Sequence, residues 1–135
     1  MTQNDQTQTI VIWDTEYWTD KGAMQRRWGG LHDSPPVLCQ IGGYKVRLNK
    51  TLDVVAEINQ LVWPQVQGRT VALTDFFHEL TGLSAQQFEE TAVDAVTGIK
   101  MLHDFIGDDL CFSYGRDVFS TVLPTCFAND IDVPL

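Results

Sequence analysis

The pattern of hydrophobic and polar positions first predicts three strands. The segment TIVIWDTEYW, residues 9–18, begins as a nearly continuous apolar run, which is typical of a strand buried in a sheet. The segments VLCQIGGYKVRL, residues 37–48, and TLDVVAEINQLVWP, residues 51–64, predict a second and a third strand with a hairpin turn at Asn49 and Lys50. We therefore expect the first three strands to form a meander.

After residue 73 the apolar positions recur at helical spacing. TDFFHELTG, residues 74–82, predicts a short helix with Thr74 as its N-cap and Gly82 as its end, and SAQQFEE predicts a further turn capped by Ser84. The longest predicted helix is TAVDAVTGIKMLHDFIG, residues 91–107. Its apolar residues predict one face that packs on a sheet. They are Ala92, Ala95, Val96, Ile99, Leu102 and Ile106.

The last part of the chain predicts one more strand and one more helix. DLCFSY, residues 109–114, indicates a short fourth strand, and RDVFSTVLPTCFAN, residues 116–129, indicates a helix bent near Pro124. Strands and helices in this order predict an α/β fold. A chain of 135 residues with 44% hydrophobic residues is long enough for one core, so we expect a single domain over residues 1–135.

Charge limits the functions that this chain can have. The formal net charge of −9 argues against a surface that coats nucleic acid, because nonspecific affinity for polyphosphate comes mainly from Lys and Arg. It does not exclude a nuclease. Two local groups of basic residues either hold a phosphate backbone or are simply solvated charges. They are Lys21, Arg26 and Arg27, and Lys45, Arg47 and Lys50.

The N-terminal segment and the spacing of the cysteines indicate the cellular compartment of the protein. The opening MTQNDQTQT lacks the basic and apolar segments of a signal peptide, and no apolar run approaches the ~20 residues that span a bilayer. We therefore expect a soluble, cytoplasmic protein without membrane contact. Cys39, Cys111 and Cys126 are odd in number and widely spaced, which predicts neither a disulfide framework nor a zinc site.

Three acidic residues carry the candidate chemistry. Asp14 and Glu16 follow the apolar run of the first strand, and residues two apart in a strand point to the same face. Asp117 comes just after the fourth predicted strand and reaches the matching end of the sheet if that strand is parallel to the first. Carboxylates gathered at strand ends are hard oxygen ligands that suit Mg²⁺ or Mn²⁺.

Four segments together resemble the motifs of one family. VIWDTEYW looks like an apolar strand followed by Asp-x-Glu, and VLCQIGGYKV like the second strand of the same family. LTDFFHELTGLSAQQFEE is similar to the segment around its Thr-Gly-Ile element, and CFSYGRDVFSTVL to its second acidic motif. In this order the segments resemble the DEDD 3'-5' exonucleases of the ribonuclease H-like superfamily, over nearly the whole chain.

This resemblance implies a fold, a reaction and a set of site residues. The fold would be a ribonuclease H-like mixed twisted sheet flanked by helices. The reaction would be metal-dependent hydrolysis of phosphodiester bonds at the 3' end of RNA or single-stranded DNA, with two Mg²⁺ or Mn²⁺ ions. The implied residues are Asp14, Glu16 and Asp117 as catalytic metal ligands, Thr81, Gly82 and Leu83 as a sugar and base pocket, and Tyr17 and Trp18 as aromatic rings that stack on bases.

The resemblance stops before the family's third motif, a His followed after four residues by Asp. The chain ends at Leu135, so we expect the C-terminal part of the fold to be missing and the isolated chain to be a very poor nuclease. Apolar surface left uncovered there would favour a homo-oligomer. The alternative function is a non-catalytic nucleic-acid-binding or assembly module that retains the nuclease fold.

Overall fold

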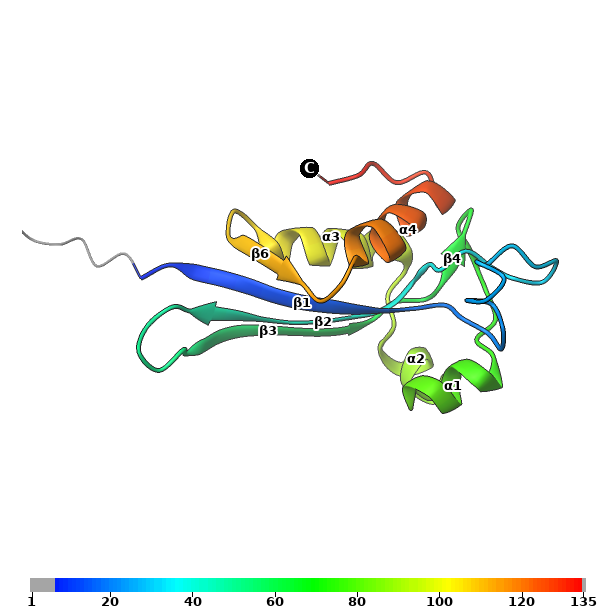
Figure 1. Cartoon of the computed structure of the whole chain (residues 1–135), viewed down its shortest axis with the longest axis horizontal. Helices are drawn as coiled ribbons and strands as arrows, with labels where there is room; N and C mark the ends of the chain where they lie inside the picture. The colour runs from blue at the N-terminus through cyan, green and yellow to red at the C-terminus, as the bar shows by residue number, and fades with distance from the viewer. Residues whose placement is uncertain (1–6, 135) are drawn as a thin grey trace, which may run out of the picture.

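A mixed four-stranded sheet forms the centre of the computed structural model, which describes residues 7–134 (Figure 1). Residues 1–6, which belong to the polar opening used above to argue against a signal peptide, lie outside the described residues. The sheet has the order β3-β2-β1-β6. Its strands are β1 (Thr9–Tyr17), β2 (Leu38–Arg47), β3 (Val54–Leu61) and β6 (Leu110–Ser113). The architecture is therefore α/β, as the sequence predicted.

Strand pairing confirms the predicted meander. β1 is antiparallel to β2, and β2 is antiparallel to β3. β6 lies on the other side of β1 and runs parallel to it, with Phe112 opposite Ile12. Asp117 was expected to reach the matching end of the sheet only if the fourth strand is parallel to the first, and this parallel pairing is present.

β2 and β3 are joined by residues 48–53, a longer loop than the turn predicted at Asn49 and Lys50. The carboxylate of Asp53 accepts hydrogen bonds from the Asn49 amide and from the Thr51 hydroxyl, both at 2.6 Å. Short polar side chains that bond within a loop stabilise it locally. This polar network explains why the turn is wider than a two-residue hairpin.

β3 ends at Leu61, before the predicted end at Pro64. Val62 makes one isolated parallel bridge with Val93, and the chain then forms a two-stranded ribbon of β4 (Gln65–Val66) and β5 (Arg69–Thr70). Proline has no N–H to donate to a ladder, which favours the end of the long strand at this position.

The short helices α1 (Asp75–Thr81) and α2 (Ala85–Thr91) begin at their predicted caps, and α1 also ends at the predicted Gly82. The Thr74 hydroxyl accepts a hydrogen bond from the backbone N–H of Phe77 at 3.1 Å. Gly82 ends α1 in the left-handed conformation with φ of 72°, which costs glycine little. Ser84 and Gln87 form a reciprocal capping box at the start of α2.

The longest helix, α3 (Ala95–Ile106), begins later than predicted. Asp94 caps it by accepting the N–H of Thr97 at 2.7 Å, and Gly107 ends it as expected. The prediction that Val96 lies on the packed face is wrong, because its side chain is 60% exposed. Gly98, which has no side chain, takes a place on that face against Val62. The buried positions of α3 are Ala95, Gly98, Ile99 and Leu102.

A π-helical segment (Val118–Val122) passes directly into α4 (Leu123–Ala128). Pro124 stands in the first turn of α4, where an N–H is not needed, so the predicted interruption lies at this junction. The Thr125 hydroxyl donates to the Thr121 carbonyl at 2.7 Å and accepts the N–H of Leu38 at 2.8 Å. These bonds fix the helix against the start of β2.

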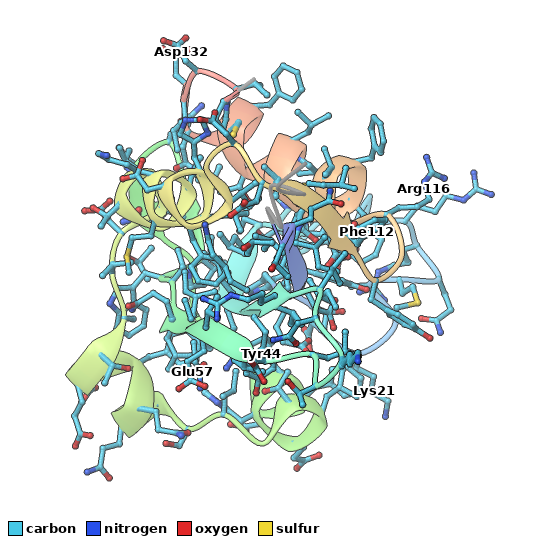
Figure 2. The ribbon with its side chains drawn as sticks, turned by 90° about the vertical axis from the view of Figure 1, so that its left-hand side faces the viewer. Lys21, Tyr44, Glu57, Phe112, Arg116 and Asp132 are labelled. Carbon is cyan, nitrogen blue, oxygen red and sulfur yellow. The ribbon has the colours of Figure 1, made fainter. Side chains whose placement is uncertain are left out.

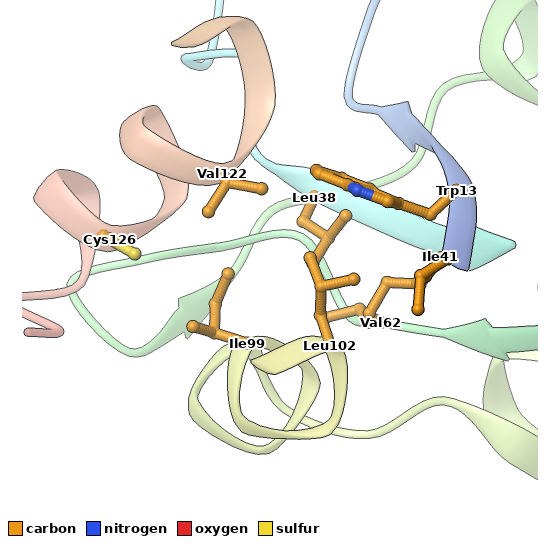
Figure 3. Packing of buried hydrophobic residues seen from close by; sticks show 9 residues of the cluster. Trp13, Leu38, Ile41, Val62, Ile99, Leu102, Val122 and Cys126 are labelled. Atoms are coloured by element: carbon orange, nitrogen blue, oxygen red, sulfur yellow. The ribbon is translucent and has the colours of Figure 1, made fainter. Parts of the chain in front are cut away.

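Two apolar clusters lie at the sheet, one formed with α3 and α4 and the other with α1, α2 and the loop after β1 (Figures 1 and 3). The first consists of Val11, Trp13, Leu38, Ile41, Val62, Ile99, Leu102, Val122 and Cys126. The second consists of Trp18, Ala23, Val37, Cys39, Leu61, Phe77 and Phe88. We call the sheet face under α3 and α4 the covered face, and the opposite one the open face.

Two further sequence predictions concern the thiols and the helices. Cys39, Cys111 and Cys126 are all free thiols in the structure. Cys39 and Cys126 are buried, whereas Cys111 is exposed. Across residues 7–134, every helix is too short or too polar to cross a bilayer.

Candidate metal centre

Two of the three predicted acids meet at β1, just beyond the last residue that pairs with β6. The backbone N–H of Thr15 lies 3.0 Å from Oδ1 of Asp14 and 3.0 Å from Oδ2 of Asp117. Because both carboxylate oxygens contact one nitrogen, they lie within about 6 Å of one another, a range in which two negative charges interact strongly. The fold therefore brings together two residues that are far apart in the sequence.

The local conformation after β6 places Asp117 at this position. The N–H of Tyr114 still donates to the carbonyl of Trp13 at 3.2 Å, so the chain follows β1 just beyond the end of β6. Gly115 then turns the chain with a φ of 83°, a conformation that glycine adopts readily. Asp117 follows directly before the π-helical segment and is only 7% exposed.

Burial and charge repulsion perturb the acids of the site. Burial, together with the hydrogen bond and the negative charge of Asp14, raises the pKa of Asp117 from 3.8 to about 6, although the Thr15 N–H acts in the opposite direction. Burial and the charge of Asp14 also raise the pKa of Glu16. The pKa of Tyr17 is raised by burial first, and then by Glu16 and Asp117. A cation would offset this concentration of negative charge.

Glu16 shares the open face with Asp14, as the two-residue spacing predicted, and is likewise exposed. The side chains of residues 7–134 do not present three carboxylate, imidazole or thiolate groups already gathered around one point. Asp14 and Asp117 thus form a close pair, with Glu16 beside it on the same strand. These groups are hard oxygen donors, the ligand type that Mg²⁺ and Mn²⁺ prefer. The donor set fits such an ion.

Asp14, but not the buried Asp117, lines a groove of about 450 Å³ on the open face. Its polar end is lined by Asp14 and Glu16, and its apolar end by Ile12, Tyr44 and Tyr114. The remaining lining residues are Trp13, Thr15, Gln40, Gly42, Gly43, Glu57, Ile58 and Asn59. No histidine of the described chain lines this groove, so its walls hold no imidazole to accept a proton.

The two aromatic residues predicted to stack on bases lie in different environments. Trp18 is 3% exposed and its indole N–H donates to the carbonyl of Ala72 at 3.0 Å, so its ring belongs to the apolar cluster. Tyr17 is half-buried and makes an edge contact with Trp28, with ring centroids 5.7 Å apart. Of the two rings, only Tyr17 keeps surface that a ligand can reach.

The predicted sugar and base pocket forms the end of α1. The Thr81 hydroxyl donates to the carbonyl of Phe77 at 2.8 Å and accepts the N–H of Leu83 at 3.2 Å. Gly82 lies between them in the left-handed conformation. These three residues are absent from the lining of the groove that holds the acids, so Thr81, Gly82 and Leu83 form a separate surface.

The basic groups are partly occupied by ion pairs. Arg26 binds both oxygens of Asp33, at 2.6 and 3.0 Å, within the loop after β1. Lys45 lies 2.8 Å from Asp109 and over the ring of Phe105, on the covered side of the sheet. Arg116, next to the acid site in sequence, extends away from the body of the protein (Figure 2).

Sequence reasoning missed the groove and the backbone donor. Tyr44 and Gly42 line the groove because they stand directly opposite Ile12 and Asp14 in the antiparallel register. Only the register makes them neighbours of the acids, although the alternation along β2 already separated them from the buried positions. No pattern in the sequence indicated that Thr15 binds both carboxylates.

The comparison with models of known protein families gave no match, and neither did the comparison with curated proteins. The resemblance to the DEDD exonucleases therefore rests on the motif residues of the sequence.

Proposed function

We propose that this chain is a metal-dependent nuclease domain related to the DEDD 3'-5' exonucleases, acting on RNA or single-stranded DNA. The observation that carries the proposal is the contact of Asp14 and Asp117 with one backbone N–H, at 3.0 Å each. Two carboxylates this close favour a bound proton or cation, because either one relieves their repulsion.

The strand order supports the same proposal. The three-stranded meander with a fourth strand parallel to the first is the arrangement expected of a ribonuclease H-like fold, and the acids lie at the ends of the two parallel strands. We therefore assign the sheet to that superfamily as part of the proposal. Asp14 follows the centre of β1, and Asp117 follows β6, in the order of the family motifs.

Each acid has a distinct part in the proposed site. Asp14 is exposed to the groove and binds from the substrate side, whereas Asp117 is buried and binds from behind it. Glu16 adds a third oxygen donor from the same face of β1. When bound, Mg²⁺ or Mn²⁺ would supply a Lewis acid for the scissile phosphate and a water of lowered pKa. Thr15 holds both carboxylates in place through its N–H.

Metal binding is the first test of this proposal. We expect weak Mn²⁺ binding to the wild type in calorimetry, and at least a tenfold loss of affinity, about 1.4 kcal/mol, in Asp14→Asn. Glu57→Gln is the matched control, because Glu57 lines the same groove on β3. Equal Mn²⁺ affinity in the wild type and in Asp14→Asn would refute the metal site.

Nuclease activity is the second test. We expect trimming of a 3'-labelled single-stranded RNA only slightly above background, because general-base catalysis typically contributes ~10²–10⁴-fold and the groove has no histidine to provide it. Robust trimming that disappears in Asp14→Asn would show that another group accepts the proton.

The second candidate function is a non-catalytic binding or assembly module. The observation in its favour is the same lack of histidine among the residues that line the groove. This candidate requires that labelled single-stranded RNA binds, or that the chain assembles, without any product in the presence of Mn²⁺. Fluorescence anisotropy measured beside the trimming assay separates the two functions.

A further inference from the structure

The open face carries two apolar rows that run across the sheet. Residues directly opposite one another on neighbouring strands point to the same face. In the first row, Ile12 on β1 lies between Tyr44 on β2 and Phe112 on β6. Figure 2 labels Tyr44 and Phe112 on their strands. The second row consists of Val46, Ile10 and Leu110, with Val54 opposite Val46 on β3.

These side chains are exposed to an extent that is unusual for large apolar residues on adjacent strands. Ile12 is 47% exposed, and Tyr44 and Phe112 are each 51% exposed. Val54 and Leu110 are exposed as well, whereas Ile10 and Val46 are partly buried. A contiguous apolar patch of this kind marks an interaction surface in soluble proteins.

No helix between residues 7 and 134 covers the two rows. α3 and α4 pack with Val11, Trp13 and Ile41 on the other face. The cluster formed with α1 and α2 includes Leu61, which is opposite Gln40 and lies beyond the acid end of the rows. Within residues 7–134, the apolar rows therefore stay uncovered in a single copy of the chain.

We propose that a second copy of this chain covers the apolar rows, with the two sheets packed face to face about a twofold axis. One flat apolar face is complementary to a copy of itself under such symmetry. Sheets that pack in this way lie about 10 Å apart, with strands crossing at about 30°. The dimer requires no metal ion. It would cover Ile12 and Tyr44, which also line the apolar end of the groove, and would therefore compete with a substrate for that surface.

The exposed area is sufficient for a dimer of the smaller kind. Five of the seven side chains in the two rows are about half exposed and bury roughly 90 Å² each when they are covered, and the partly buried Ile10 and Val46 add less. The sum is on the order of 600 Å² for each copy, compared with about 800 Å² in a standard interface. The surrounding polar rim adds to this area.

Charge favours a protein over a nucleic acid as the occupant. The rows contain no cation, and they are bordered by Asp14 and Glu57. Lys45 and Arg47, the two basic residues of β2, alternate with the row residues and have the parity of the covered side, where Lys45 pairs with Asp109. Without a bound metal ion, a polyanion lying on this face would meet carboxylates that no cation offsets.

The same carboxylates give the dimer a specific dependence on salt. With a net charge of −9 per chain and acids at the rim, the two copies repel one another. Salt screens this repulsion and leaves apolar contacts intact. Association should therefore tighten as the salt concentration rises, whereas binding driven by opposite charges weakens.

Sedimentation equilibrium of the full chain, in about 0.05 M and 0.5 M NaCl, tests the proposal. We expect a wild-type dimer that is tighter at high salt, and a dissociation constant at least tenfold higher in Phe112→Lys and in Tyr44→Lys. Phe127→Lys is the matched control, because Phe127 is an exposed phenylalanine on α4, on the covered side of the sheet. Asp14→Asn should retain the dimer, which separates this test from that of the metal site.

Three results would overturn the proposal. If the wild type is a monomer at high protein concentration in both NaCl concentrations, the dimer does not exist. If Phe127→Lys dissociates as readily as Phe112→Lys, the interface is not on the open face. Association that weakens with salt would indicate a charged contact or a polyanionic ligand. Melting curves verify that the variants are folded, and the wild-type salt series needs no variant.

Discussion

The two faces of β1 differ although they belong to the same nine residues. Val11 and Trp13 are buried under α3 and α4, whereas Ile12 and Asp14, their neighbours in the chain, point to the open face. The covered face is closely packed and contributes mainly to stability. The open face combines apolar rows with carboxylates and offers surface for binding. One strand thus supplies the core with alternate residues and the candidate site with the others.

Isoleucines on the two faces should differ most in their contribution to stability. Ile41→Ala removes a fully buried side chain and should lower the free energy of unfolding by about 2–5 kcal/mol. Ile12→Ala removes a half-exposed one and should cost about 1 kcal/mol or less. Urea unfolding at low protein concentration measures both. Similar losses would mean that the open face is covered.

Adjacent glycines of β2 provide a smaller and closer comparison. A Cβ on Gly43 would lie 3.0 Å from the Ile12 carbonyl oxygen and 3.1 Å from Cβ of Trp13, so Gly43→Ala should destabilise the chain by about 1–3 kcal/mol. A Cβ on Gly42 meets nothing within 4 Å, so Gly42→Ala should change stability by less than about 0.5 kcal/mol. Thermal unfolding of the two variants decides whether packing differs between the faces.

The acid end of the sheet should respond to pH. Because the pKa of Asp117 is about 6 in the folded chain and 3.8 ordinarily, its protonated form stabilises the fold fully below pH 3.8. This contribution is lost as the pH rises through 6. It amounts to about 1–2 kcal/mol after solvent screening is allowed for.

Asp117→Asn should remove this dependence, because its amide can still accept the N–H of Thr15 and can donate to Asp14. We expect the variant to melt at a higher temperature than the wild type at pH 7.5, and at a similar temperature at pH 4. The variant should also lose stabilisation by Mn²⁺. If Asp117→Asn and the wild type melted at the same temperature at pH 7.5 as well as at pH 4, this would contradict the repulsion between Asp14 and Asp117.

Local chemistry made several elements predictable. Thr74, Ser84, Gly82 and Gly107 cap or end their helices where the sequence placed them, because a capping bond involves residues only a few positions apart. The face of α3 was predicted less well. Val96 fits an apolar stripe by spacing, but the helix turns it to solvent and packs Gly98 against Val62.

The sequence predicted which acidic residues belong to the candidate site, but not how the fold buries or exposes the residues around them. The two-residue spacing of Asp14 and Glu16 placed both on one face, and Asp117 was assigned to the end of the fourth strand. Trp18 shows the limit of this reasoning. An aromatic residue after a strand suits a stacking surface and a core equally well, and it is the loop and α1 packed around Trp18 that bury it.

By itself the sequence determined the four strands of the sheet, the helix caps and the shared face of Asp14 and Glu16, because these depend on near neighbours and on the period of the backbone. The features that depend on pairing between distant segments were decided only by the tertiary structure. The parallel register of β1 and β6 brings Asp117 to the N–H of Thr15, and it aligns Phe112 with Ile12 and Tyr44. Contacts between segments distant in sequence depend on how whole elements pack, and no local pattern encodes that arrangement.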